Sequence, residues 1–363
     1  MRLDQITLKD FRNIPQAEVS FVPGKSALVG KNAQGKTNLM EAIYLLACGK
    51  SHRARKTREM IREGQDLFEI AVLVSGEGLP FELKMRFGEK EGREIYKNGV
   101  RLQKLSEFFG LFRVVLFCPE HLALIQDGPG KRRSFVDSAI CQLRPYYVSL
   151  LNEHNKIEAQ RAALLKQKGG KNIPREYFAV WDERLAQVSV KIACIRAQYL
   201  KEMGDRAPRY FSQISRGKET LSLRYASDVY REGATREEME KAYTDLLRDS
   251  FFSDEKYGYT TKGVHRDEME IFIGNKSARL FASQGQQRSA VLALKFAEGE
   301  ISRDMTGQDP VYLLDDVLSE LDEERRAYVT AGLVGKQVIL SGTDEEDFSF
   351  VDKIIRVSGG AFR

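Results

Sequence analysis

The sequence has few of the features that mark secreted, membrane-spanning or zinc-binding proteins. No apolar run approaches the roughly 18 residues of a membrane-spanning helix, and the first residues include no apolar signal-peptide core. Only four cysteines and four histidines occur, and neither set has the spacing of a zinc site. Scattered cysteines without a C-x-x-C pair are typical of reduced thiols. We therefore expect a cytoplasmic protein with no membrane contact, no disulfide framework and no zinc.

The charge balance is mildly basic, with 57 lysine and arginine residues against 52 acidic residues. This balance permits nucleic-acid binding, but a solvated charged surface explains it as well. Two stretches are more basic than the rest, residues 50–58 and 131–133. For each stretch taken alone, contact with DNA phosphates and a solvated loop remain equal alternatives. The candidate DNA-binding residues are Lys50, Arg53, Arg55, Lys56 and Arg58.

The most specific motif is at residues 30–37, which match the phosphate-binding pattern G-x-x-x-x-G-K-T. An apolar run that suits a buried strand precedes it, and a segment with helical spacing follows it. The Lys36 ammonium would reach the β- and γ-phosphates, and the Thr37 hydroxyl would bind Mg²⁺. The predicted nucleotide-binding residues are Gly30, Lys31, Asn32, Ala33, Gln34, Gly35, Lys36, Thr37 and Asn38.

A second part of a nucleotide site is predicted at residues 311–316, an apolar strand that ends in two acids. In a P-loop protein we expect this strand to lie beside the P-loop strand. Asp315 would help to hold Mg²⁺, and Asp316 could orient or deprotonate the attacking water. Two acids after an apolar run are a weak signal alone, and they gain weight because a P-loop lies upstream.

Residues 283–289 form a small polar turn that opens a helix, since apolar periodicity follows. Such a turn can bind an anion at the helix N-terminus. A simple helix cap explains the same pattern, so both alternatives stay open.

The remaining segments predict an α/β protein with an inserted helical part. Alternating patterns predict strands at residues 3–11 and 17–21, an antiparallel β-meander at 66–101 with an Asn98-Gly99 turn, and a buried strand at 113–117. Heptad spacing is clear at residues 181–199 and poorer at 147–164. These two helices could form an antiparallel hairpin or a packed helical subdomain. The poorer seam consists of Tyr147, Leu150, His154, Ile157, Arg161 and Leu164.

Taken together, the motifs resemble those of ABC-type ATPases. Residues 283–287 are similar to the ABC signature, residues 319–322 to the D-loop, and residues 337–344 to the switch strand. Within that superfamily, the chain resembles the RecF family of bacterial recombination proteins nearly from end to end. The stretches that carry this resemblance are residues 9–13, 30–37, 50–53, 119–122, 128–137, 263–267, 283–287 and 314–317.

The resemblance implies a P-loop ABC-type ATPase head with an antiparallel β-subdomain and an inserted helical arm domain. We expect the head at residues 1–138 and 255–363 and the arm at 139–254. The insertion is too short for SMC coiled coils, and Thr343 stands where transporter ATPases have a histidine. Asp316 replaces the usual glutamate, and its carboxylate is set back by about 1.5 Å, so we expect slow hydrolysis. The alternatives are an SMC-like or transporter-type ATPase subunit and a small-molecule P-loop kinase.

The same resemblance implies a site that two subunits complete. Lys36 and Asp316 of one chain and Ser283 of the other would carry ATP hydrolysis, with Arg12, Gly285 and Gln286 also at the nucleotide. MgATP would then drive homodimerisation around double-stranded or gapped, single-stranded DNA, and weak hydrolysis would reset it. The implied roles are recombinational repair, replication and recombinase loading at single-strand gaps, with RecR and the RecO pathway as partners.

Overall fold

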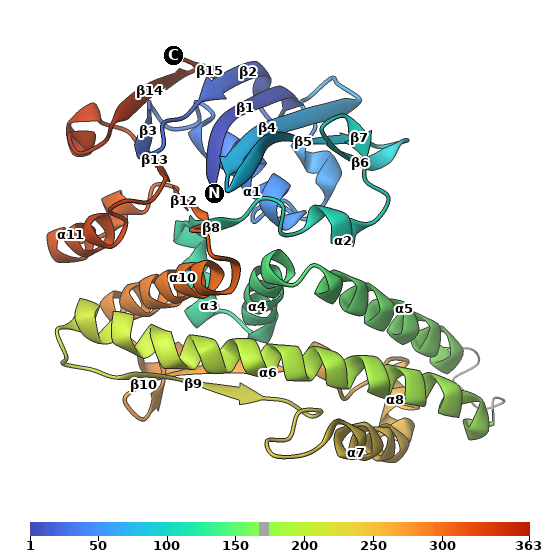
Figure 1. Ribbon diagram of the computed structural model, residues 1–363. Helices are drawn as coiled ribbons and strands as arrows, with labels where there is room; N and C mark the ends of the chain where they lie inside the picture. Colours follow the sequence, from blue (N-terminus) through green and yellow to red (C-terminus); the bar gives the residue numbers. More distant parts are fainter. Residues whose placement is uncertain (167–173) are drawn as a thin grey trace.

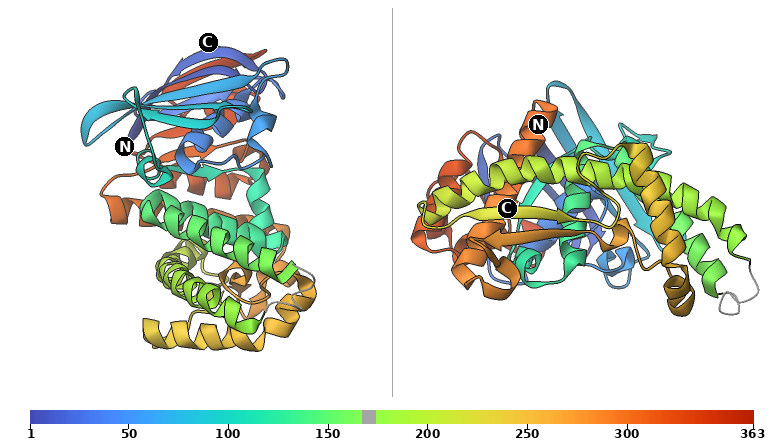
Figure 2. Two further views of the ribbon diagram at one scale, coloured as in Figure 1. Left: turned by 90° about the vertical axis from the view of Figure 1, so that its right-hand side faces the viewer. Right: turned by 90° about the horizontal axis from the view of Figure 1, so that it is seen from below.

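The computed structural model describes residues 1–166 and 174–363. Two lobes lie one above the other: a lobe built on two sheets and a lobe built mainly on helices (Figure 1). The view from the side shows the same two layers (Figure 2). Among the helices of the described residues, none is long and apolar enough to cross a membrane.

The first sheet of the upper lobe is mixed, with strand order β15-β14-β3-β13-β12-β8. All its neighbouring strands are parallel except β14 and β15. Four-residue strands such as β8 and β12 are buried along their whole length, as expected where both faces of a parallel sheet are covered. The strands are β3 (Lys25–Val29), β8 (Val114–Phe117), β12 (Val311–Leu314), β13 (Val338–Gly342), β14 (Lys353–Ser358) and β15 (Ala361–Phe362).

One prediction about this sheet is wrong. The strand that ends in Asp315 and Asp316 does not lie beside the P-loop strand, because β13 lies between β12 and β3 and pairs with both. The buried apolar residues of β13 make it as suitable for the sheet interior as β12. Side-chain alternation does not reveal the order of parallel strands, so the sequence did not exclude this arrangement.

The second sheet is antiparallel, in the order β2-β1-β4-β5-β6-β7, and confirms the predicted meander. Asn98 and Gly99 have φ of 49° and 77°, the left-handed pair of a type I′ hairpin turn. Helix α1 (Lys36–Cys48) packs against this sheet, and Phe11, Ile43 and Phe68 belong to their shared core. The strands are β1 (Arg2–Phe11), β2 (Ile14–Ser20), β4 (Leu67–Gly76), β5 (Gly78–Gly88), β6 (Gly92–Lys97) and β7 (Val100–Arg101).

The lower lobe is organised around the long helix α6. Its predicted heptad positions Leu185, Val188 and Ile192 are buried, and α5, α7 and α10 contact it. A three-stranded sheet, in the order β11-β10-β9, also packs there, and its strand β9 lies within residues 139–254, for which the sequence predicted a helical arm. The main elements are α4 (Pro129–Leu143), α5 (Tyr146–Lys166), α6 (Ala179–Ser215), β9 (Leu221–Ala226), α7 (Arg236–Asp249), α8 (Phe251–Tyr257), β10 (Glu268–Ile273), β11 (Lys276–Ser277) and α10 (Gln284–Thr306).

Short helices connect these elements. They are η1 (Thr57–Met60), α2 (Leu105–Phe108), η2 (Pro119–Leu122), α3 (Ala123–Gln126), η4 (Arg175–Phe178), η5 (Val264–Arg266), α9 (Ala278–Phe281), η6 (Leu318–Glu320), α11 (Glu323–Gly332) and η7 (Glu345–Phe348).

The predicted domain boundaries fall inside helices. The boundary at 138/139 lies within α4, and the boundary at 254/255 lies within α8. In addition, β9 pairs with β10 across the second boundary, and α10 shares its core with α6. The extents of the head and the arm as functional units stay a prediction.

Candidate nucleotide site

The phosphate-binding loop lies between the end of β3 and the start of α1. Gly35 caps α1 with a left-handed φ of 116°, which a residue with a Cβ rarely adopts. At Gly30 a Cβ would lie 2.2 Å from the carbonyl oxygen of Val357, so no larger residue fits there. The glycines therefore let the loop curl tightly at the N-terminus of α1, where backbone N–H groups and the helix dipole favour an anion.

A turn near the end of the described chain supports the loop. The backbone N–H of Gly359 donates to the side-chain oxygen of Gln34 at 2.6 Å, and the N–H of Gly360 donates to the Gln34 carbonyl at 2.9 Å. The shape of the loop thus depends on the turn between β14 and β15. The sequence motif carries no sign of this distant contact.

Lys36 is buried at the loop, and its ammonium donates to the carbonyl oxygens of Gly30 and Lys31. Among the ion pairs of residues 1–166 and 174–363, none involves Lys36. Its positive charge is therefore free to meet a phosphate, for which a charged hydrogen bond is strong.

Asp315, which follows β12, contacts the P-loop although β12 is not paired with the P-loop strand β3. Asp315 Oδ1 accepts hydrogen bonds from the Thr37 hydroxyl at 3.1 Å and from the Ser341 hydroxyl at 2.7 Å. Burial, and to a smaller extent the neighbouring Asp316 carboxylate, raises the pKa of Asp315 to about 6. A divalent cation would favour the ionised form, and these hard oxygen donors suit Mg²⁺. The predicted metal ligands therefore fit that ion.

Asp316 has a left-handed backbone, with φ of 51°, which is uncommon for a residue other than glycine. Its N–H donates to the Ser341 hydroxyl at 3.0 Å. Ser341, at the end of β13, thus contacts both acids, and the sequence reasoning missed it. Its position in the polar tip of the predicted switch strand was the available signal.

A buried carboxylate beside the loop organises two of the predicted arginines. Glu41 of α1 is fully buried and accepts two hydrogen bonds from Arg12, at 2.7 and 2.9 Å, and one from Ser51. Burial acts to raise the pKa of Glu41, but these hydrogen bonds outweigh it and lower the pKa below its usual value. Arg53 lies 3.9 Å from the same carboxylate and donates to Asn38 at 3.3 Å. The structure therefore brings Arg12, Asn38 and Arg53 together at the loop, through a glutamate that the sequence reasoning missed.

The two basic stretches meet at one groove of about 420 Å³ between the sheet lobe and the helical lobe. Lys50, Arg53 and Arg55 line it from one side, and Lys131 of α4 lines it from the other. Lys56 and Arg58 are exposed further along the first stretch. Exposed cations around a groove suit a phosphate backbone.

The rest of the second basic stretch has a structural role. Arg132 is 4% exposed and pairs with Glu268 of β10 at 2.6 and 2.7 Å. Arg133 donates to the carbonyl oxygen of Asp267 at 2.8 Å. Of the three basic residues, Lys131 is the one that lines the groove.

The signature residues open α10 in the helical lobe. Ser283 caps the helix and accepts from the Gln286 N–H at 3.3 Å, while the Gln286 side chain accepts from the Ser283 N–H at 2.7 Å. At Gly285 a Cβ would lie 3.2 Å from the guanidinium of Arg325. The turn is thus a helix cap, its anion-binding role stays a prediction, and Ser283 is exposed. Across the residues that the structure describes, no hydrogen bond joins this turn to residues 30–38 of the same chain.

Comparisons with known proteins cover the whole chain. The family model described as "RecF/RecN/SMC N terminal domain" matches residues 2–360. A DNA replication and repair protein RecF of Clostridium acetobutylicum is 37% identical over 365 residues, which cover 100% of this chain and 98% of the relative. A RecF of Exiguobacterium sp. is also 37% identical, over 95% of this chain and 93% of the relative.

Solved structures give the same result. The structure of "the recombination mediator protein RecF-ATP in RecFOR pathway" is 32% identical, with a TM-score of 0.94, over 99% of this chain and 96% of that one. An SMC head bound to a ScpA domain has a TM-score of 0.57 at 17% identity, which shows a shared fold alone. The predicted ABC-type ATPase head is therefore confirmed.

Proposed function

The chain belongs to the RecF family of DNA replication and repair proteins, and we propose that it is a clamp that MgATP closes on DNA. An ABC-type ATPase activity follows from the family, and the transporter and kinase alternatives fall away. The observation that carries the proposal is the contact of Thr37 with Asp315 at the end of the P-loop, together with Arg53, which lines the groove and donates to Asn38 of the loop.

We assign ATP to the loop, with backbone and side-chain contacts from the predicted set and from Arg12. Thr37 and Asp315 would hold Mg²⁺, which supplies positive charge to the phosphates when bound. Asp316 would orient the attacking water. The residues assigned to the nucleotide are Gly30, Lys31, Asn32, Ala33, Gln34, Gly35, Lys36, Thr37 and Asn38.

Ser283, Gly285 and Gln286 would complete the site in a second copy of the chain. This turn is exposed and lies apart from the P-loop of its own chain. In a head-to-tail pair of chains, it would contact the γ-phosphate of the ATP bound to the P-loop of the other chain. The pair would have two-fold symmetry, with one nucleotide at each of two equal sites. Loss of the γ-phosphate removes the contact, so hydrolysis would separate the chains.

DNA would bind through its phosphates to the exposed cations of the groove and its rim. Contacts of this kind do not depend on the base sequence. The residues proposed for this contact are Lys50, Arg53, Arg55, Lys56 and Arg58. The name of the related structure places RecF in the RecFOR pathway. We accordingly propose RecR and the RecO pathway as partners in recombinase loading at gapped or single-stranded DNA.

ATP-dependent binding of labelled duplex and gapped DNA tests the clamp. We expect ATP to strengthen binding by the unchanged chain at least about tenfold at fixed salt, and Ser283→Arg to remove this effect by blocking the paired interface. The matched control is Thr235→Arg, because Thr235 is an exposed N-cap with the same capping box on α7. Equal ATP effects in the unchanged chain and Ser283→Arg would contradict the shared site.

Asp316→Asn tests the water-orienting role. The amide keeps the size of the side chain but is a much weaker base, so we expect steady-state ATP hydrolysis to fall about tenfold to 100-fold. ATP binding should stay close to normal, and the ATP-dependent dimer should persist for longer in sedimentation experiments. Unchanged turnover would show that another group positions the water.

A further inference from the structure

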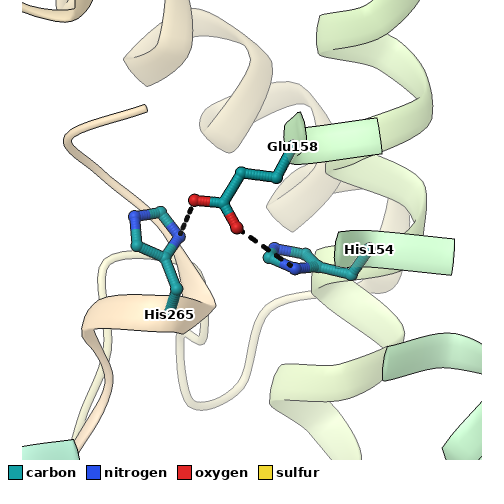
Figure 3. A group of neighbouring side chains, drawn as sticks. All are labelled: His154, Glu158 and His265. Atoms are coloured by element: carbon teal, nitrogen blue, oxygen red, sulfur yellow. Dashed lines mark ion pairs between the residues drawn. The ribbon is translucent and has the colours of Figure 1, made fainter. Parts of the chain in front are cut away.

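Three side chains that the nucleotide site does not use come together in the helical lobe (Figure 3). His154 and Glu158 lie one turn apart on α5, and His265 lies in η5. His154 Nδ1 is 3.9 Å from one Glu158 oxygen, and His265 Nδ1 is 3.6 Å from the other. One donor atom of each residue lies within 4.8 Å of the other two. Figure 3 shows the carboxylate between the two rings.

The hydrogen bonding of His265 determines which ring nitrogen is free. Nε2 lies 2.8 Å from the carbonyl oxygen of Thr260, which can only accept, so Nε2 carries a proton. In the neutral ring, Nδ1 then turns its lone pair toward Glu158, and two acceptors face each other. A cation between them would remove this repulsion. Histidines that bind metals commonly donate their second nitrogen to a backbone carbonyl in this way.

Lysine and arginine side chains of the described residues do not supply positive charge to the cluster. Within the described ranges, Glu158 forms no ion pair with lysine or arginine. The guanidinium of Arg196 is already paired with Asp137 and Asp267. His154 is 3% exposed, and its Nε2 is buried without a hydrogen-bond partner among the residues described.

We propose that His154, Glu158 and His265 bind a divalent transition-metal ion, with zinc as the first choice. Two imidazoles and one carboxylate are a usual zinc donor set that leaves a fourth position for water. Tetrahedral ligands at about 2.0–2.1 Å from zinc lie about 3.4 Å apart, whereas the donor atoms here lie within 4.8 Å of one another, so zinc would draw them together by up to about 1.4 Å. The side chains of Glu158 and His265 are 26% and 21% exposed, which leaves room for entry of the ion and for a water ligand.

A metal here would tie α5 to the segment that leads into β10. Arg196 of α6 already donates to the carbonyl oxygen of Val264 in that segment at 2.6 Å. The metal would therefore add a link from α5 to the segment that α6 already holds. This role is separate from nucleotide binding, since none of the three residues belongs to the P-loop, the acids or the signature.

Zinc content of the full chain tests the proposal directly. Untagged protein is stripped with a chelator, incubated with ZnCl₂ without nucleotide, desalted and analysed for metal. We expect about one zinc per chain, and at least a tenfold lower content in Glu158→Gln and in His265→Ala. Co²⁺ should give the visible absorption of a low-symmetry site in the unchanged chain, and this absorption should be absent from Glu158→Gln and His265→Ala. Zinc should raise Tm by about 5 °C, an effect absent from Glu158→Gln.

Two controls make the result decisive. His121→Ala removes a half-buried histidine outside the cluster, so it should keep the zinc content of the unchanged chain. Glu158→Gln keeps the size of a partly exposed side chain, so it remains informative if His265→Ala fails to fold. Absence of zinc from the unchanged chain, or equal zinc in Glu158→Gln, would overturn the proposal, the second result by showing that zinc binds elsewhere.

Discussion

Replacing Lys36 with alanine is expected to abolish ATP binding. The ammonium is buried at the loop, donates to the Gly30 and Lys31 carbonyls and has no carboxylate partner in the described parts of the chain. Alanine removes the charge that would meet the β- and γ-phosphates. A hydrogen bond to a charged group contributes about 1.5–3 kcal/mol, and Lys36 would form more than one, so affinity should fall at least about 100-fold. Equilibrium binding of a fluorescent ATP analogue measures this change.

Lys31→Ala provides the matched control for that measurement. Lys31 is assigned to the nucleotide through its backbone N–H, which alanine keeps, and its side chain is exposed. A general loss of surface charge would affect both variants alike, whereas the proposed role predicts a large loss for Lys36→Ala alone. Normal ATP affinity of a folded Lys36→Ala chain would contradict the assignment of the loop.

The parts of the fold that could be predicted are those that local chemistry determines. The glycine and lysine spacing at residues 30–37 predicted a loop between a strand and a helix, and β3 and α1 lie there. Asn98-Gly99 predicted a type I′ turn because both residues tolerate positive φ. The start of α7 is also set locally, because Thr235 and Glu238 form a capping box of two reciprocal hydrogen bonds. Each signal concerns residues within a few positions of one another.

The parts that could not be predicted depend on distant contacts. The insertion of β13 between β3 and β12 is decided by packing across the sheet, and the pairing of β9 with β10 joins residues about 45 positions apart. Support of Gln34 by Gly359 spans 325 positions. Glu41 was missed because a single acid in an apolar helix has no distinctive spacing. Its importance comes from Arg12 and Arg53, which only the fold places beside it.

The poorer heptad seam of α5 shows how a mismatch in a pattern can mark a specific interaction. The polar residues at two of its positions, His154 and Arg161, are both buried. His154 contributes to the proposed metal cluster. Arg161 is completely buried and donates to Asp182 at 2.8 Å, to Asp254 at 2.7 Å and to Thr260 at 3.0 Å. These contacts join α5, α6 and α8, so Arg161 is a polar link between elements.

Arg161→Ala is therefore expected to destabilise the helical lobe strongly. The change leaves two acids without their cation, and Asp254 is fully buried. Removing one partner from a buried ion pair costs about 3–5 kcal/mol, because the remaining charge keeps its desolvation penalty. Tm should accordingly fall by about 10 °C, measured by calorimetry or circular dichroism.

The exposed pair of Arg184 and Glu153, also between α5 and α6, gives the matched control. These side chains are 57% and 46% exposed and 3.9 Å apart, so Arg184→Ala should change stability by less than about 1 kcal/mol. The double variant Arg161→Met with Asp254→Asn should recover part of the loss, because it also removes the fully buried charge. Equal Tm values for Arg161→Ala and Arg184→Ala would mean that the buried ions are solvated or rearranged, and that α5 is held by its apolar contacts alone.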